Sequence, residues 1–174
     1  MVGQPSNTKV MNSLEKNSDI AELLVQVSDP EIPVLSIMDM GVVREIERDG
    51  QAVLVKITPT YSGCPAMDTI ATDIKITLDR AGYSTTVKQI LAPAWTTDWI
   101  TERGRKHLEE YGIAPPLDAS ADKSALLDGA RIVKCTNCGS TNTKMVSQFG
   151  STACKALFQC NDCLEPFDYF KCLK

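Results

Sequence analysis

The sequence predicts an α+β protein with two folded parts: a small mixed sheet with helices on it, then a linker and a C-terminal β-rich zinc ribbon. Strand and helix patterns alternate in the first half of the chain, whereas six of the seven cysteines lie beyond residue 134. A segment rich in Pro, Ala, Asp and Ser separates these regions. We therefore expect a flexible arm without hydrophobic periodicity at 1–17, the α+β domain at 18–113, the linker at 114–130 and the ribbon at 131–174.

The α+β domain is predicted to begin with a helix. Ser18 can cap it, and apolar residues then recur on one helical face until Pro30 prevents continuation. Two prolines stiffen the loop that follows, and this loop carries the carboxylates of Asp29 and Glu31.

A hairpin and a crossover helix should follow this loop. The segments 42–46 and 52–58 are rich in β-branched residues, and Asp49-Gly50 between them favours a tight turn. A helix at 65–81 then leads to a third strand at 85–91. Because a strand, helix and strand in this order form a crossover, we expect the third strand to lie parallel to the second.

A third helix is expected between Trp95 and Tyr111, where apolar residues recur at helical spacing. Gly112 and the pair Pro115-Pro116 should end it. The linker would begin immediately afterwards.

Composition excludes several classes of partner. The net charge of −4 and the pI of about 5.0 argue against nucleic-acid binding, which needs clustered basic residues. No apolar run is long enough to span a bilayer, and the amino terminus lacks a signal-peptide core. We expect a cytoplasmic protein that binds neither nucleic acid nor membrane.

Two paired-cysteine turns predict a metal site in the ribbon. Cys135 and Cys138 lie in one Cys-x-x-Cys turn, and Cys160 and Cys163 lie in another. Thiolates are soft ligands that favour zinc or iron, and so small a segment has too little core to fold without a metal. Since four ligands close the coordination shell, we expect a structural zinc. An iron site like that of rubredoxin, or a cluster, is the alternative.

Three further cysteines lie outside these turns. Cys64 precedes a predicted helix, whose dipole and unpaired amides would favour the thiolate, and Thr60 and Ser62 add hydroxyls nearby. The competing interpretation is a buried, unreactive side chain. Cys154 follows a run of small residues and is as consistent with a reactive thiol as with packing, whereas Cys172 ends an aromatic strand and should be packed.

Enzymatic turnover has little support in the sequence. It contains no glycine-rich phosphate loop, and its one histidine, His107, lies in a charged helical segment far from Cys64.

Several motifs together resemble known families. Asp29-Pro30-Glu31-Ile32-Pro33, Asp39-Met40-Gly41-Val42-Val43 and Thr60-Tyr61-Ser62-Gly63-Cys64-Pro65-Ala66 resemble the small iron-sulfur assembly domain family that includes SufT-like proteins, over residues 19 to roughly 112. When Ala92-Pro93-Ala94-Trp95-Thr96-Thr97-Asp98-Trp99, Phe149-Gly150-Ser151-Thr152-Ala153-Cys154-Lys155 and the ribbon are added, the whole chain resembles the PaaD family of bacterial phenylacetate degradation.

This resemblance implies a role in maturing or supporting the multicomponent monooxygenase that epoxidises phenylacetyl-CoA. Its iron-sulfur reductase and its oxygenase would be the partners. By family analogy Cys64, with Cys154 as a second candidate, would handle a transient iron-sulfur cluster, and Asp29 and Glu31 would shape the surroundings of Cys64. Without the resemblance, the two acids would be surface charges on a rigid loop.

Three functions therefore remain open. The first is an iron-sulfur cluster assembly or maturation factor for the epoxidase. The second is a noncatalytic structural subunit of the epoxidase complex. The third is a thiol enzyme such as a persulfide carrier that uses Cys64 or Cys154.

Overall fold

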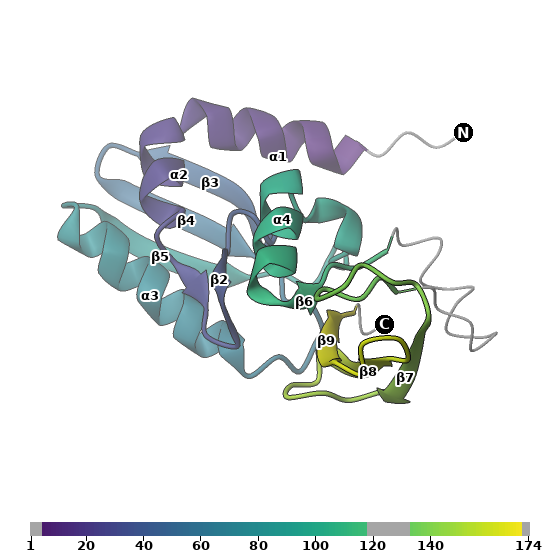
Figure 1. Cartoon of the computed structure of the whole chain (residues 1–174). Helices are drawn as coiled ribbons and strands as arrows, with labels where there is room; N and C mark the ends of the chain where they lie inside the picture. The colour runs from purple at the N-terminus through teal and green to yellow at the C-terminus, as the bar shows by residue number, and fades with distance from the viewer. Residues whose placement is uncertain (1–4, 118–132, 172–174) are drawn as a thin grey trace. The chain divides into compact units, whose positions relative to one another are not determined.

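The computed structural model describes residues 5–117 and 133–171 (Figure 1). Most of the predicted linker, and Cys172, lie outside the described residues. The chain divides into two compact units, residues 1–95 and residues 96–174. The first is a mixed α+β unit and the second contains a cysteine-bearing antiparallel ribbon, so the predicted fold class is confirmed.

The first unit is built on a three-stranded sheet with strand order β3-β4-β5. Its elements are α1 (Pro5–Lys16), α2 (Ser18–Leu24), β1 (Ser28–Asp29), β2 (Ile32–Ser36), β3 (Val43–Asp49), β4 (Ala52–Ile57), α3 (Ala66–Arg80) and β5 (Ser84–Gln89). Strands β3 and β4 form the predicted antiparallel hairpin, and Gly50 supplies the positive φ of +58° that its turn requires. Strand β5 pairs parallel to β4 through the crossover helix α3, as the sequence predicts.

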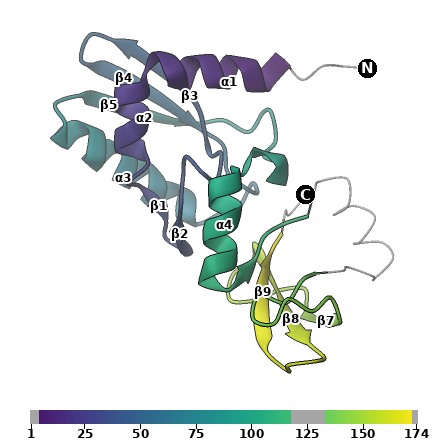
Figure 2. The same cartoon turned by 45° about the horizontal axis from the view of Figure 1, so that its top comes forward.

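Apolar side chains on one face of the sheet make the core of this unit. Val53, Val55 and Ile57 are each at most 2% exposed on β4, and Ile70 and Ile74 of α3 are equally buried. Helices α2 and α3 contact each other, and the ribbon view shows both in front of the sheet (Figure 2). The loop with Cys64 leads from β4 into α3, so this packing positions it.

The amino-terminal segment contains a helix that the sequence analysis did not predict, since residues 5–16, part of the expected flexible arm, form α1. The helix is held by polar contacts with the edge strand β3. Ser13 Oγ donates to the carbonyl of Ile46 and accepts from its N–H at 3.0 and 2.9 Å, and Asn17 Nδ2 donates to the same carbonyl at 3.0 Å. Hydrophobic periodicity cannot reveal such an attachment, because it depends on hydrogen bonds to an edge strand.

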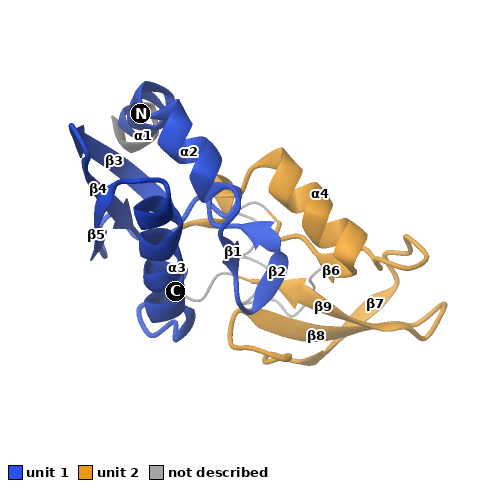
Figure 3. Cartoon of the chain, turned by 90° about the vertical axis from the view of Figure 1, so that its left-hand side faces the viewer, with its two compact units in different colours: residues 1–95 blue, residues 96–174 orange. Residues whose placement is uncertain are grey.

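The second unit begins earlier than the predicted ribbon (Figure 3). Its elements are a 3₁₀ turn at Thr97–Trp99, α4 (Glu102–Tyr111), β6 (Ile113–Ala114), β7 (Thr143–Ser147), β8 (Lys155–Cys160) and β9 (Pro166–Phe170), with sheet order β6-β9-β8-β7. Strand β6 pairs parallel to β9, so residues that we placed at the end of the first domain and the start of the linker join the ribbon sheet. The two units divide at residue 95, whereas the sequence analysis placed the end of the first domain at residue 113.

Helix α4 is shorter than expected. It starts after Thr101, whose side chain accepts from the N–H of Gly104 at 3.0 Å, so both tryptophans precede the helix. Gly112 ends it with a φ of +91°, as predicted. No helix in the described part of the chain is long and apolar enough to cross a bilayer.

Removal of the Asn17 amide should loosen α1 from the sheet. Asn17 is 5% exposed and also donates to Ser13 O at 2.9 Å, so Asn17→Ala should lower the free energy of unfolding by about 1–2 kcal/mol in urea titrations. It should also speed amide exchange at Ile46. The control Asn12→Ala alters an exposed amide on the same helix and should change neither quantity; equal effects of the two variants would contradict the attachment.

Candidate functional site

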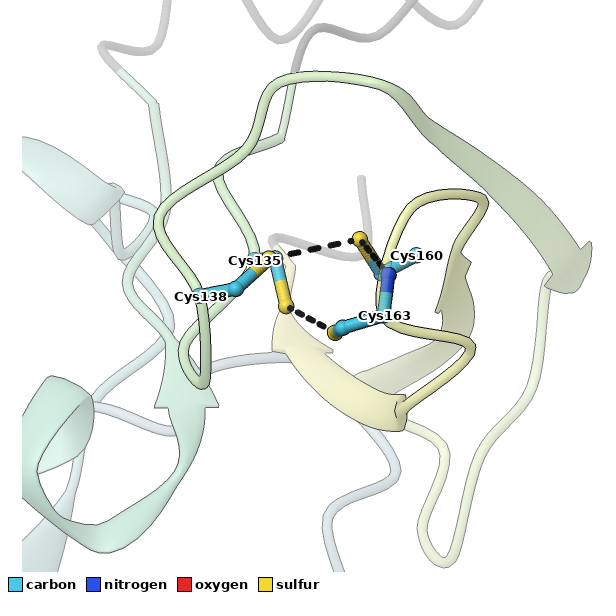
Figure 4. A group of neighbouring side chains, drawn as sticks. All are labelled: Cys135, Cys138, Cys160 and Cys163. Atoms are coloured by element: carbon cyan, nitrogen blue, oxygen red, sulfur yellow. Dashed lines mark hydrogen bonds between the residues drawn. The ribbon is translucent and has the colours of Figure 1, made fainter.

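The four paired cysteines of the second unit converge on one point (Figure 4). Their sulfur atoms all lie within 4.8 Å of one another; Cys135 Sγ is 3.7 Å from Cys163 Sγ, and Cys138 Sγ is 3.6 Å from Cys160 Sγ. A tetrahedral zinc with bonds of about 2.3 Å would separate its sulfur ligands by about 3.8 Å. The cluster therefore has the size that a tetrahedral metal requires.

The two cysteine turns have matching backbones. Cys135 N–H donates to Ser140 O at 2.8 Å, and Cys160 N–H donates to Glu165 O at 2.9 Å. In both turns the residue that follows the second cysteine has a left-handed backbone conformation, with φ of +75° at Gly139 and +65° at Leu164. A leucine in this conformation is strained, so the second turn is held by its surroundings as well as by its sequence.

The other three thiols of this cluster oppose the ionisation of Cys138. The backbone N–H of Ser140 acts to lower the pKa of Cys138, but hydrogen bonds with Cys163, Cys160 and Cys135, together with desolvation, raise that pKa to about 12. Four neighbouring thiolates need a cation to balance their charge, and metal binding releases these protons. Among the described residues the donor set is four soft sulfurs, which fits a closed zinc or iron site.

Cys64 lies in the first unit, in the turn that leads into α3. Its N–H donates to Tyr61 O at 3.1 Å, and its half-buried sulfur is hydrogen-bonded to the backbone N–H of Ala66 and to the side chain of Thr60. Asp29 and Glu31 lie close enough to act electrostatically on the thiol. The structure thus brings three of the four predicted supporting residues to Cys64, whereas Ser62 is exposed in the same turn.

The electrostatics of Cys64 correct the expectation that the helix end favours its thiolate. Burial raises the pKa of the Cys64 thiol above its usual value. The N–H of Ala66 and the Thr60 side chain act to lower it, but the carboxylates of Asp29 and Glu31 raise it further. These effects favour the protonated thiol over the thiolate, and a cation next to the sulfur would act in the opposite direction.

Asp29 is more than a surface charge. Its residue is 5% exposed, and its Oδ1 accepts hydrogen bonds from the N–H groups of Glu31 at 2.7 Å and Ile32 at 3.1 Å. This carboxylate shapes the turn between β1 and β2 and so positions Glu31.

Cys154 lies in the second unit, buried at 5% exposure, with its sulfur 3.1 Å from Thr152 Oγ1. Of the preceding small residues, Gly150 is explained by packing, because a Cβ there would lie 2.6 Å from Asp168 Oδ1 and 3.3 Å from Lys155 Cβ. Ser151 Oγ joins this loop to the strands by accepting from Lys155 Nζ and donating to Asp168 Oδ2, both at 3.1 Å. The backbone at residues 150–151 therefore lies close to Lys155 and Asp168 of the neighbouring strands.

One group near the metal cluster was missed by the sequence analysis. Asp162 lies between Cys160 and Cys163. Its carboxylate accepts hydrogen bonds from Ser140 and Asn142, which follow the first cysteine turn in the chain. A polar residue inside a Cys-x-x-Cys turn is a weak signal, and its partners are visible only after the two turns meet.

Two family models match the chain. The model described as an iron-sulfur cluster assembly protein matches residues 17–89, and the model of the PaaD zinc beta ribbon domain matches residues 119–171.

Similar proteins support both matches. A protein of Escherichia coli, named as a candidate subunit of 1,2-phenylacetyl-CoA epoxidase, is 46% identical over 157 residues, which cover 89% of this chain and 92% of that protein. A protein of Porphyromonas gingivalis named as an Fe-S protein maturation auxiliary factor is 32% identical over 98 residues, 55% of this chain and 92% of that protein. The crystal structure of a DUF59 domain from Bacillus anthracis shares the fold, with a TM-score of 0.51, 22% identity and coverage of 56% of this chain and 95% of that one.

The carboxylate effect on Cys64 can be measured by alkylation. Because only the thiolate reacts, labelling of Cys64, followed by peptide mass spectrometry at a series of pH values, should have its midpoint above that of an unperturbed thiol. Glu31→Gln removes one of the charges that raise the pKa, so it should shift this midpoint to lower pH and speed labelling at pH 7. Glu22→Gln changes an exposed acid on α2 and should leave the profile unchanged. An unshifted midpoint in Glu31→Gln would contradict the electrostatic coupling.

Proposed function

Because the chain belongs to the PaaD family, in which an iron-sulfur cluster assembly domain precedes a zinc ribbon, we propose that it is a maturation factor for the iron-sulfur reductase of a phenylacetyl-CoA epoxidase. The observation that carries this proposal is the combination of the two domains in one chain with 46% identity to the epoxidase-named relative. The maturation role of the first domain is supported by the second relative, which is named for that activity.

Cys64 is proposed to contact the cluster during transfer. A cluster normally takes four thiolate ligands, and Cys64 is the one cysteine of residues 1–95, so this unit supplies a single ligand. The remaining ligands would come from the client or the donor, which suits transfer better than storage. The carboxylates of Asp29 and Glu31 would keep the thiol protonated until positively charged iron approaches.

The four-cysteine cluster is proposed to hold a structural zinc. Cys135, Cys138, Cys160 and Cys163 would be its ligands, and zinc would supply the charge that lets all four thiols ionise. With four protein ligands the shell is closed, so the ribbon would stabilise the second unit and contribute a binding surface, while Cys64 would do the chemistry.

A noncatalytic subunit of the epoxidase complex is the second candidate. One observation favours it, namely that the Escherichia coli relative is named as a subunit. In that case the reductase would carry its full cluster without this protein, and this chain would co-purify with the oxygenase in a fixed ratio.

The two functions are separated by the cluster content of the reductase. The variant Cys64→Ser is expressed in cells that lack the native protein, and the reductase is then purified. Because the transfer ligand is missing, this reductase should contain as little iron and sulfide as reductase from cells with no copy of this protein. Cys154→Ser, which alters a buried thiol, should restore wild-type loading. Full loading of the reductase with Cys64→Ser would refute the maturation role, and full loading without any copy of this protein would favour the structural subunit.

Metal removal should affect the two units differently. Structural zinc binding contributes roughly 10–16 kcal/mol in small zinc domains, so a strong chelator should unfold much of residues 96–174. Hydrogen–deuterium exchange should become fast in β8 and β9 and stay slow in α3 and β4. Cys160→Ser should reproduce this pattern without chelator. Fast exchange throughout α3 in the metal-free protein would contradict the independence of the first unit.

A further inference from the structure

The two cysteine turns are joined by more than their sulfur atoms. The first turn (135–139) and the second turn (160–164) belong to different parts of the ribbon. The carboxylate of Asp162, in the second turn, accepts from Ser140 Oγ at 2.5 Å through one oxygen and from Asn142 Nδ2 at 2.6 Å through the other. Both donors follow the first turn directly, so a single carboxylate bridges the two segments.

A second residue of the same turn completes the connection. Asn161 Nδ2 donates to Asn142 Oδ1 at 3.0 Å, and Asn161 N–H donates to Asn142 O at 2.8 Å. The amide of Asn142 therefore donates to Asp162 with its nitrogen and accepts from Asn161 with its oxygen. We call Ser140, Asn142, Asn161 and Asp162 the Asp162 clamp.

The clamp adjoins the accessible half of the metal cluster. Cys135 and Cys160 are buried, whereas Cys138 and Cys163 are exposed, so a chelator or competing thiol reaches the metal through the second pair. Asp162 immediately precedes Cys163 in the chain. For the metal to be released, an exposed sulfur must first dissociate from it. The turn that carries this sulfur must then move away before the sulfur rebinds.

We propose that Asp162 is a positioning residue that keeps the two cysteine turns together and thereby slows release of the bound metal. Its two oxygens are occupied by protein donors, so it acts through the turns and does not ligate the metal. With the clamp intact, a sulfur that has dissociated stays near the metal and rebinds. Loss of an outer partner of a metal site commonly reduces metal affinity about 10–100-fold. The inference rests on the zinc occupancy proposed above.

The test compares two acids of the same region. Asp162→Asn keeps the size of the side chain but removes its charge and one acceptor, whereas Glu165→Gln removes an exposed charge just beyond the second turn. Each full-length protein is loaded with zinc, its zinc content and its folding in excess zinc are checked, and zinc transfer to a coloured chelator is then timed. We expect Asp162→Asn to release zinc about 10-fold faster than wild type and Glu165→Gln to release it within about 2-fold of wild type.

Two variants of Ser140 distinguish loss of the clamp from a folding defect. Ser140→Ala removes one donor and should also speed zinc release, whereas Ser140→Thr keeps the hydroxyl and should keep the slow rate. Wild-type release from Asp162→Asn, or equal acceleration in Glu165→Gln, would overturn the role of the clamp. A wild-type protein that takes up no zinc would instead overturn the proposed zinc site, so the two failures are distinguishable.

Discussion

The convergence of four thiols is the constraint on which the second unit depends. The four sulfur atoms lie within 4.8 Å of one another, and their neighbours raise the pKa of Cys138. A bound metal cation would balance the charge of the thiolates. The second cysteine turn connects β8 to β9, and β9 in turn pairs with β6. Tyr169 of β9 also accepts the N–H of Leu117 through its hydroxyl at 3.2 Å. The four-cysteine cluster is therefore connected, through β9, to segments that lie far from it in the sequence.

The same chemical group has opposite surroundings in the two units. In the ribbon, thiols are gathered with one another, so a cation is bound by all of them. Around Cys64 a single thiol is gathered with two carboxylates, which disfavour the free thiolate and would favour a cationic cargo. These surroundings support the two proposed roles, a permanently bound metal in the ribbon and transient contact with a cluster at Cys64.

The parts of the fold that the sequence predicted are those set by neighbouring residues. The hairpin follows from Asp49-Gly50 between two β-branched segments, and the parallel pairing of β5 follows from the crossover through α3. Helix α1 was missed because its attachment is made by Ser13 and Asn17 to the edge of β3, and such bonds leave no hydrophobic pattern. The pairing of β6 with β9 was not predicted, because it joins residues more than fifty positions apart.

The same distinction applies to the sites. The sequence by itself determined the four-cysteine cluster, because each Cys-x-x-Cys turn fixes two sulfurs through a few backbone dihedrals and only the meeting of two turns remained to be found. It also identified Cys64 and the acids at 29 and 31 through their motifs. Only the tertiary structure decided that these acids act on the thiol and raise its pKa, and that Asp162 joins the two turns. Charge and hydrogen bonding act through space, so they depend on which distant segments the fold brings together.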